Sequence, residues 1–526
     1  PANWRRSALL KITDLYVAEN RLTNAVQRLE RLFIRHPGDP ATELAHMTLG
    51  ELRLRQFYGL PDASRLKSTN LLSEALGHFD VILKGDADAD LMGKSWLGRG
   101  WALWEWGNLS GKRLQFSLAL QAYSNAVAEL PKSEEQAVAQ FKVADCLFHG
   151  ADYASASSNY WAAIRIATNT VGYNNRLVDR ALYQIVRSGV ERLDLPSANQ
   201  AVSNLIEWFP SSFYSDRSLL LYGQALNRQG KPSESRTVLA SFAKVFPKST
   251  LLPESQLAVA RTHVMDGSWV SSIIEYDRWV TNYPAHPALP QAEFDRAWLN
   301  HQAGNRARAF QLFTNYVVRF PTNSLAPVAQ KWIADHQFQS GKFAEAEQGY
   351  RRLFENTNLL ANARGMEWEA RLNAGRSAFF RQEHAAAGLL LASVINATNA
   401  PVAEQARVLL ERVRQGAQPG GHRKVDVRVG EQGQDQPGAC EAVQPEVQVD
   451  ADGGGQVVDD ASRGEAGQEG GGPDEAGVDE RQGNDDPPEP AHRQVGPGGQ
   501  PCQTGADDSG RRRDQHAQLH GAPERV

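Results

Sequence analysis

Seven side chains are the strongest candidates for chemistry in this sequence, and their types suit binding rather than catalysis. Three lie close together, two form an Asn-Arg pair and two stand alone: Trp101, Trp104, Glu105, Asn227, Arg228, Arg261 and Trp298. Aromatic and arginine side chains most often dominate the energy of protein–protein binding. Tryptophans can also simply pack between helices. We favour packing for Trp96 and Trp106, and both interpretations stay open for Trp101 and Trp104.

No motif for catalysis or cofactor binding accompanies these residues. The sequence lacks a glycine-rich phosphate loop, paired cysteines at metal spacing, a His-Glu-x-x-His motif and a Gly-x-Ser-x-Gly elbow. His301 and His336 are single histidines, for which we expect a structural or solvent role. We expect Cys146 to be a small buried thiol. The sequence therefore predicts a protein that is not an enzyme and has no cofactor or metal.

The elements that must position these residues recur with a fixed period. The pairs Phe209-Pro210, Phe246-Pro247, Tyr283-Pro284 and Phe320-Pro321 are 37 residues apart. Two further series keep that spacing, namely Gly230, Gly267, Gly304 and Gly341, and Pro253, Pro290 and Pro327. Three series with one period indicate an internal repeat.

Each series has a physical reason in a helical hairpin. Proline is tolerated in the first turn of a helix, where Pro253 and its equivalents fall, because the N–H there has no partner within the helix. The glycines suit the left-handed residue that ends a helix, so we expect positive φ at Gly230, Gly267 and Gly304. An apolar stripe follows each glycine, and the aromatic-proline pair ends the second helix.

These residues resemble the tetratricopeptide repeat. The fullest match is Trp96, Gly100, Gly107, Ala119, Tyr123, Ala126 and Pro131, with about seven extra residues at the turn, around Ser110 to Arg113. The resemblance spans roughly residues 1–415. The longer period and the Phe-Pro-x-Ser-like stops look most like the bacterial cell-envelope branch of the family, the outer-membrane assembly lipoprotein BamD and the Tol-Pal coordinator proteins.

The fold expected from this resemblance is all-α, a right-handed superhelix of hairpins over residues 1–415. The hairpins are predicted near residues 8–37, 42–85, 90–131, 135–170, 176–210, 213–247, 250–284, 287–321, 324–358 and 362–398, with a last helix at 401–414. In the first, Asn20 stands where the turn glycine belongs, and residues 59–70 form an insertion in the second. The resemblance also implies that the first helices line a concave groove, with the seven candidate residues on that face.

Residues 416–526 differ sharply in composition. They contain no Phe, Tyr, Trp, Ile or Met and a single leucine, Leu519. Such a segment cannot bury enough apolar surface to offset its chain entropy, so it is predicted to be a disordered tail. It holds 22 acidic and 10 basic residues, a net charge of −12, which leaves residues 1–415 with 39 acidic and 46 basic residues, a net charge of +7.

Three interpretations of this tail stay open. It is a solvated spacer, a segment that docks on a partner or on the basic repeats, or the product of an out-of-frame read of GC-rich DNA. The triplet of arginines at 511–513 lies in acidic surroundings without interleaved aromatics, which does not favour nucleic-acid binding.

The chain begins without methionine, and its first methionine is Met47, so we expect a fragment or a processed form. No leader or 18-residue apolar run is seen, and no direct membrane span is expected. We expect a periplasmic or envelope-associated protein because of the resemblance. The oligomeric state cannot be predicted.

Two functions are compatible with these observations. The first is a non-enzymatic scaffold that binds other proteins or peptide segments. The alternative is a regulatory or substrate-recruiting module of a larger enzyme or secretion machine.

Overall fold

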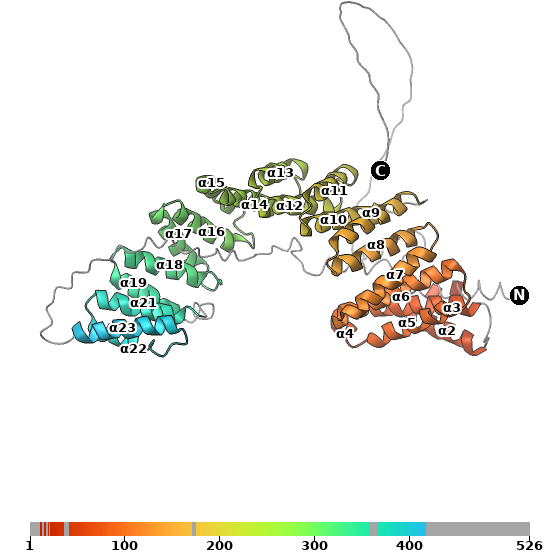
Figure 1. Cartoon of the computed structure of the whole chain (residues 1–526), viewed down its shortest axis with the longest axis horizontal. Coiled ribbons are helices and arrows are strands. Elements are labelled where there is room, and N and C mark those ends of the chain that lie inside the picture. The colour runs from red at the N-terminus through yellow and green to blue at the C-terminus, as the bar shows by residue number, and fades with distance from the viewer. Residues whose placement is uncertain are drawn as a thin grey trace, which may run out of the picture. The chain divides into compact units, whose positions relative to one another are not determined.

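The computed structural model describes residues 21–35, 41–170, 175–356 and 365–416, together with Lys11, Ile12, Leu15, Tyr16 and Glu19. Within these ranges every regular element is a helix, and successive helices lie side by side in chain order (Figure 1). The prediction of an all-α protein built from tandem helical hairpins is confirmed. The predicted tail beyond Gly416, Asn20 and most of residues 8–20 of the first predicted hairpin lie outside the described residues.

Helix α2 (Leu22–Arg35) precedes nine described hairpins, each made of a first and a second helix. In chain order, the pairs are α3 (Ala41–Tyr58) with α5 (Thr69–Leu83), α6 (Ala89–Ser110) with α7 (Arg113–Glu129), α8 (Glu134–His149) with α9 (Tyr153–Thr168), α10 (Asn175–Glu191) with α11 (Leu195–Trp208), α12 (Phe213–Arg228) with α13 (Pro232–Val245), α14 (Leu252–Met265) with α15 (Trp269–Asn282), α16 (Leu289–Gln302) with α17 (Arg306–Arg319), α18 (Ala326–Gln339) with α19 (Phe343–Glu355), and α21 (Glu367–Phe380) with α22 (His384–Ala392). A short helix, α4 (Asp62–Arg65), occupies the predicted insertion, and α23 (Ala400–Gly416) follows the last hairpin.

The helix boundaries follow from the repeated residues. Pro253, Pro290 and Pro327 all stand in the first turn of a first helix, as predicted. The aromatic residue before each stop proline, for example Phe246 or Phe320, is the residue at which the second helix ends. Its N–H still bonds back to the helix, whereas the proline that follows has no N–H to donate.

The tight turns confirm the prediction about the glycines. Gly230, Gly267, Gly304 and Gly341 have φ values of 71°, 68°, 80° and 75°. The next residue closes the turn by donating its N–H five residues back, as Lys231 does to Leu226 over 3.0 Å. Three other turns reach the same conformation without glycine, at Ala151, Leu193 and Gln382, with φ of 62°, 60° and 64°.

The hairpin of α6 and α7 departs from the prediction. The extra residues do not enlarge the turn but lengthen the first helix, so α6 has 22 residues and the turn falls at Gly111, with φ of 64°. Gly107 is therefore a helical residue and not the turn glycine. A side chain there would collide with a neighbour, because an added Cβ would lie 2.8 Å from a ring carbon of Phe116.

The core is a succession of small apolar layers between neighbouring hairpins. Second helices supply their largest side chains, such as Tyr123, Phe242, Trp279 and Phe313, which are at most 1% exposed. Small residues face them across the hairpin, and an added Cβ at Gly100 would lie 2.5 Å from the Tyr123 ring. The helices that pack on one another belong to the same or to neighbouring hairpins, as expected for a repeat protein, and the largest apolar cluster is continuous from α8 to α14.

Candidate partner-binding surface

One position of the first helix carries a polar, charged or tryptophan side chain in eight consecutive hairpins. It lies six residues before the positive-φ residue of the turn. We name these eight residues the first-helix row: Glu105, Asp145, Arg187, Gln224, Arg261, Trp298, Asp335 and Arg376. Because equivalent positions on equivalent helices face equivalent directions, the row repeats along the chain. Three of the seven predicted residues belong to it.

The first two residues of the row are buried acids. Asp145 is 9% exposed, and both its oxygens are satisfied: Lys142 Nζ lies 2.9 Å from Oδ2, and Tyr160 Oη donates to Oδ1 over 2.7 Å. Burial and the adjacent carboxylate raise the pKa of Tyr160, which keeps its hydroxyl protonated as a donor. Glu105 is 6% exposed and accepts a bond of 3.4 Å from Tyr58 Oη.

The tryptophans of α6 lie against the same cluster. Trp101 is 4% exposed, with Lys142 Nζ 4.4 Å from its ring centroid and Tyr123 edge-on to it. The expectation that Trp101 would be exposed for binding is therefore wrong, because Lys142 of α8 lies over its ring, and Glu105 is buried as well. Trp104 is half-buried beside Phe116. Trp96 and Trp106 pack against the core, as predicted.

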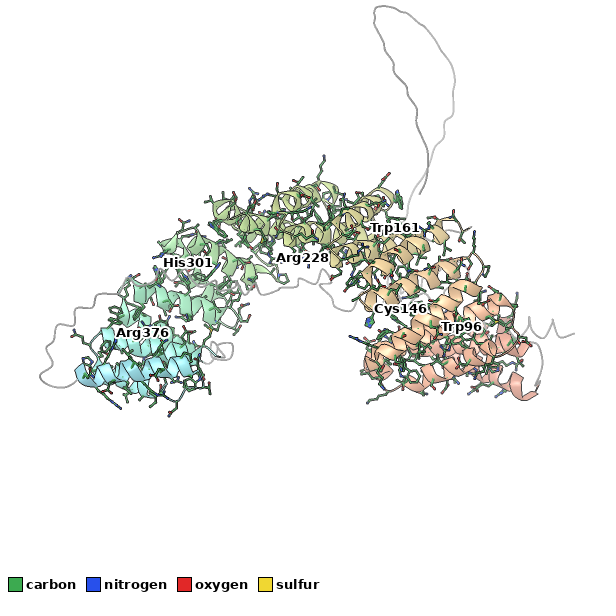
Figure 2. All side chains as sticks on the ribbon, viewed as in Figure 1. Trp96, Cys146, Trp161, Arg228, His301 and Arg376 are labelled. Atoms are coloured by element: carbon green, nitrogen blue, oxygen red, sulfur yellow. The ribbon has the colours of Figure 1, made fainter. Side chains whose placement is uncertain are left out.

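The middle of the row is less buried. Arg261 is half-buried and bonds to Tyr276, which also donates to Asp295 of the next hairpin over 3.1 Å. Burial raises the pKa of Asp295, although Arg261 opposes this shift. One helical turn beyond Gln224, Asn227 is half-buried, whereas Arg228 is exposed and makes no hydrogen bond or ion pair to any described residue (Figure 2).

An aromatic strip surrounds the sixth residue of the row. Trp298 is 38% exposed and contacts His301, whose ring lies 5.2 Å from that of Trp332. Trp332 in turn stacks on His336 with an interplanar angle of 4°. Burial lowers the pKa of both histidines, and Arg306 lowers it further, which favours the neutral form of each ring. We predicted only a structural or solvent role for these histidines.

The last two residues of the row differ in whether a partner could reach them. Asp335 accepts from Tyr350 Oη over 2.6 Å and pairs with Lys331 Nζ at 3.2 Å, so it is engaged within the protein. Arg376 is exposed on α21 (Figure 2), and its guanidinium lies 5.6 Å from the Phe338 ring centroid. Phe338 also contacts Phe380, which is 43% exposed.

The position of the row was readable from the sequence, although we did not predict it as a series. Counting back six residues from each turn glycine gives Gln224, Arg261, Trp298 and Asp335. For Arg187 and Arg376 this signal is absent, because their turns contain Leu193 and Gln382 in place of glycine.

The described residues offer little to catalysis or metal binding. They contain no group of three or more potential metal-ligating side chains. Cys146 is buried as predicted, and burial raises the pKa of its thiol, which disfavours the nucleophilic thiolate. No helix in the described part of the chain is both long and apolar enough to cross a membrane.

A family model matches part of this array. Residues 217–249, which cover most of α12, all of α13 and the following turn, match the tetratricopeptide repeat family. The neighbouring hairpins share the period and turn of that unit, so the described part of the chain is a tandem array of helical hairpins of which one matches this family. No curated protein sequence matches the chain.

Among solved structures, a tetratricopeptide repeat protein from Parabacteroides merdae is 15% identical and covers 55% of this chain and 96% of its own, with a TM-score of 0.33. The C-terminal part of a repeat protein from Cytophaga hutchinsonii is 13% identical, with coverages of 50% and 96% and a TM-score of 0.37. PilF of Pseudomonas aeruginosa is 14% identical, with coverages of 48% and 99% and a TM-score of 0.29.

Proposed function

We propose that this chain, a tandem repeat protein with a tetratricopeptide repeat at residues 217–249, is a non-enzymatic scaffold that binds segments of other proteins. The observation that carries this proposal is the first-helix row. Its side chains vary between acidic, basic, amide and tryptophan types at one repeated position, which suits binding of an extended partner through successive side chains.

The available part of this surface lies in the second half of the array. Trp298 and Arg376 of the row are exposed, as is Arg228 one helical turn beyond Gln224, and all three belong to residue types that most often anchor partners. Glu105, Asp145 and Asp335 are engaged within the protein and support the hairpins instead. We therefore expect contacts with a partner to concentrate on α12, α16 and α21.

A cell-envelope location belongs to the same proposal. Its support is the 37-residue period and the aromatic-proline stops, which are similar to those of bacterial envelope members of the family. Fractionation of the source organism with an antibody against the chain tests this location, and a purely cytoplasmic signal would contradict it.

A pull-down with the full chain as bait tests the scaffold. Partners recovered by the wild type should be reduced about tenfold or more with Trp298→Ala, because an anchor contributes about 2 kcal/mol. Arg165→Ala, an exposed arginine of α9 outside the row, is the matched control. Equal recovery with the control and with variants of all three exposed residues would overturn the proposal.

A further inference from the structure

Helix α10 carries an arginine that is buried without a counter-charge. Arg180 is 7% exposed, and no hydrogen bond or ion pair joins it to any described residue. Its guanidinium lies 5.0 Å from the ring centroid of Phe141 on α8. Two helical turns further on, Arg187 repeats the arrangement, with its guanidinium 4.8 Å from Phe148.

The acids around these two arginines are already engaged. Asp145 is held by Lys142 and Tyr160, and Asp179 accepts a bond of 2.7 Å from Ser212 Oγ. Glu191, the remaining acid of this face of α10, is exposed and forms no ion pair with Arg187 among the described residues. The surroundings of Arg180 and Arg187 therefore have an unbalanced positive charge.

The guanidinium nitrogens of Arg180 still reach the surface, because none of them is a fully covered atom without a partner, so an anion from outside the chain can approach them. Stacking on a phenylalanine covers one face of a guanidinium and leaves its in-plane N–H donors free. Those donors match a carboxylate in two parallel bonds, which is why arginine suits this ligand better than lysine.

The spacing of the two arginines defines the ligand. Seven residues of an α-helix rise about 10 Å, and three residues of an extended chain span about the same distance. We propose that Arg180 and Arg187 bind two carboxylates of an acidic partner segment, aspartates or glutamates three residues apart. Gln184 lies between them and accepts a bond of 3.1 Å from Arg187 Nη1, which orients that arginine. This inference names the partner chemistry for the proposed scaffold.

Fluorescence polarisation on the full chain at low salt tests the proposal. The probe is a capped, labelled 12-residue Gly/Ser peptide with two glutamates three residues apart. We expect it to bind about tenfold more tightly than the same peptide with glutamines, and more tightly than one with adjacent glutamates. Equal binding of the three peptides would overturn the proposal, and so would displacement by inorganic phosphate at lower concentration than by the unlabelled peptide.

Two variants separate binding from structure. Arg180→Met should weaken binding of the diglutamate peptide about tenfold. It should leave the melting temperature of the protein unchanged or higher, since it removes a buried charge that has no ion partner among the described residues. Arg165→Met, on the outer part of α9, should change neither measurement. A lower melting temperature with unchanged peptide affinity would make Arg180 a structural residue and overturn the proposal.

The outcome is independent of the pull-down. If a partner is recovered and its binding depends on Trp298 but not on Arg180, the result supports the scaffold proposal and contradicts the acidic-segment proposal. If the peptide binds as expected but no protein partner is recovered, the result contradicts the scaffold proposal and supports the anion-binding site.

Discussion

The hairpins from α6 to α10 and those from α14 to α21 use the same first-helix position in opposite ways. In the earlier hairpins the position holds Glu105 and Asp145, which are buried, and cations of the next first helix stack on the aromatics beside them. In the later ones it holds Trp298 and Arg376, which are exposed. Glu105 and Asp145 therefore contribute to packing between repeats, whereas Trp298 and Arg376 remain accessible at the same position.

The physical difference lies in what covers the position. Lys142 of α8 reaches back over Trp101, and its charge is balanced by Asp145, so the cation can be buried at this seam. Trp298 contacts the ring of His301, and burial lowers the pKa of that histidine. The same repeated position can therefore be covered by the next hairpin or remain exposed.

The largest contrast is expected from the tryptophans. Trp101→Ala should lower the free energy of unfolding by about 3–5 kcal/mol, as is usual for a buried tryptophan. Trp298→Ala should lower it by about 1 kcal/mol or less, because the side chain is 38% exposed. Thermal melts followed by circular dichroism measure both, and similar losses would remove the distinction between the two regions.

Replacement by alanine should lower the free energy of unfolding more at Asp145 than at Asp335. Asp145→Ala leaves Lys142 and the Tyr160 hydroxyl buried without their partner, at a cost of about 3 kcal/mol. Asp335→Ala should cost about 1 kcal/mol, because Lys331 keeps Glu369 at 3.2 Å and the site is half-exposed. Chemical denaturation of both variants provides the comparison, and an equal or reversed order would contradict it.

Acid should weaken the hairpin of α3 and α5, which precedes both regions, through a histidine pair. His46 and His78 have their Nδ1 atoms 3.0 Å apart, and burial, then His46 and Arg53, lower the pKa of His78 to about 4. Because the folded pKa lies below the unfolded value of about 6.5, stability is full above pH 6.5 and is lost as the pH falls towards 4. After discounting for solvent exposure, we expect a loss of about 1–2 kcal/mol.

His78→Gln should flatten this part of the pH profile, since glutamine cannot take up the proton. Melting temperatures between pH 4 and pH 8 test it. A profile for His78→Gln that is as steep as that of the wild type would show that other groups cause the loss.

The smallest effects are expected at the turns. Leu193 has φ of 60° and is 69% exposed, so Leu193→Gly should stabilise the chain by about 0.5–1 kcal/mol. Gly267→Val should cost roughly 1 kcal/mol or more, because a β-branched residue is poorly tolerated at its φ of 68°. Destabilisation by Leu193→Gly would mean that the leucine contributes packing that outweighs its backbone strain.

Much of the fold could be predicted from the sequence because its signals are local. A proline favours a helix start, a glycine permits positive φ, and an aromatic-proline pair ends a helix, and each acts within a few residues of its own position. Pro253, Gly230 and Phe320 are examples of these three effects. The same logic did not anticipate the length of α6, because a helix can absorb extra residues and Gly107 can serve close packing against Phe116.

The sequence by itself determined the period, the helix boundaries and the residue types on the first helices. Only the tertiary structure decided which of those residues are covered, because coverage depends on a helix roughly 40 residues away. Trp101 and Trp298 are alike in type, yet Lys142 buries the first and no described cation reaches the second. Likewise, the solitary charge of Arg180 becomes visible only once α8 and α10 are packed together, because neither helix alone shows which acids are already engaged.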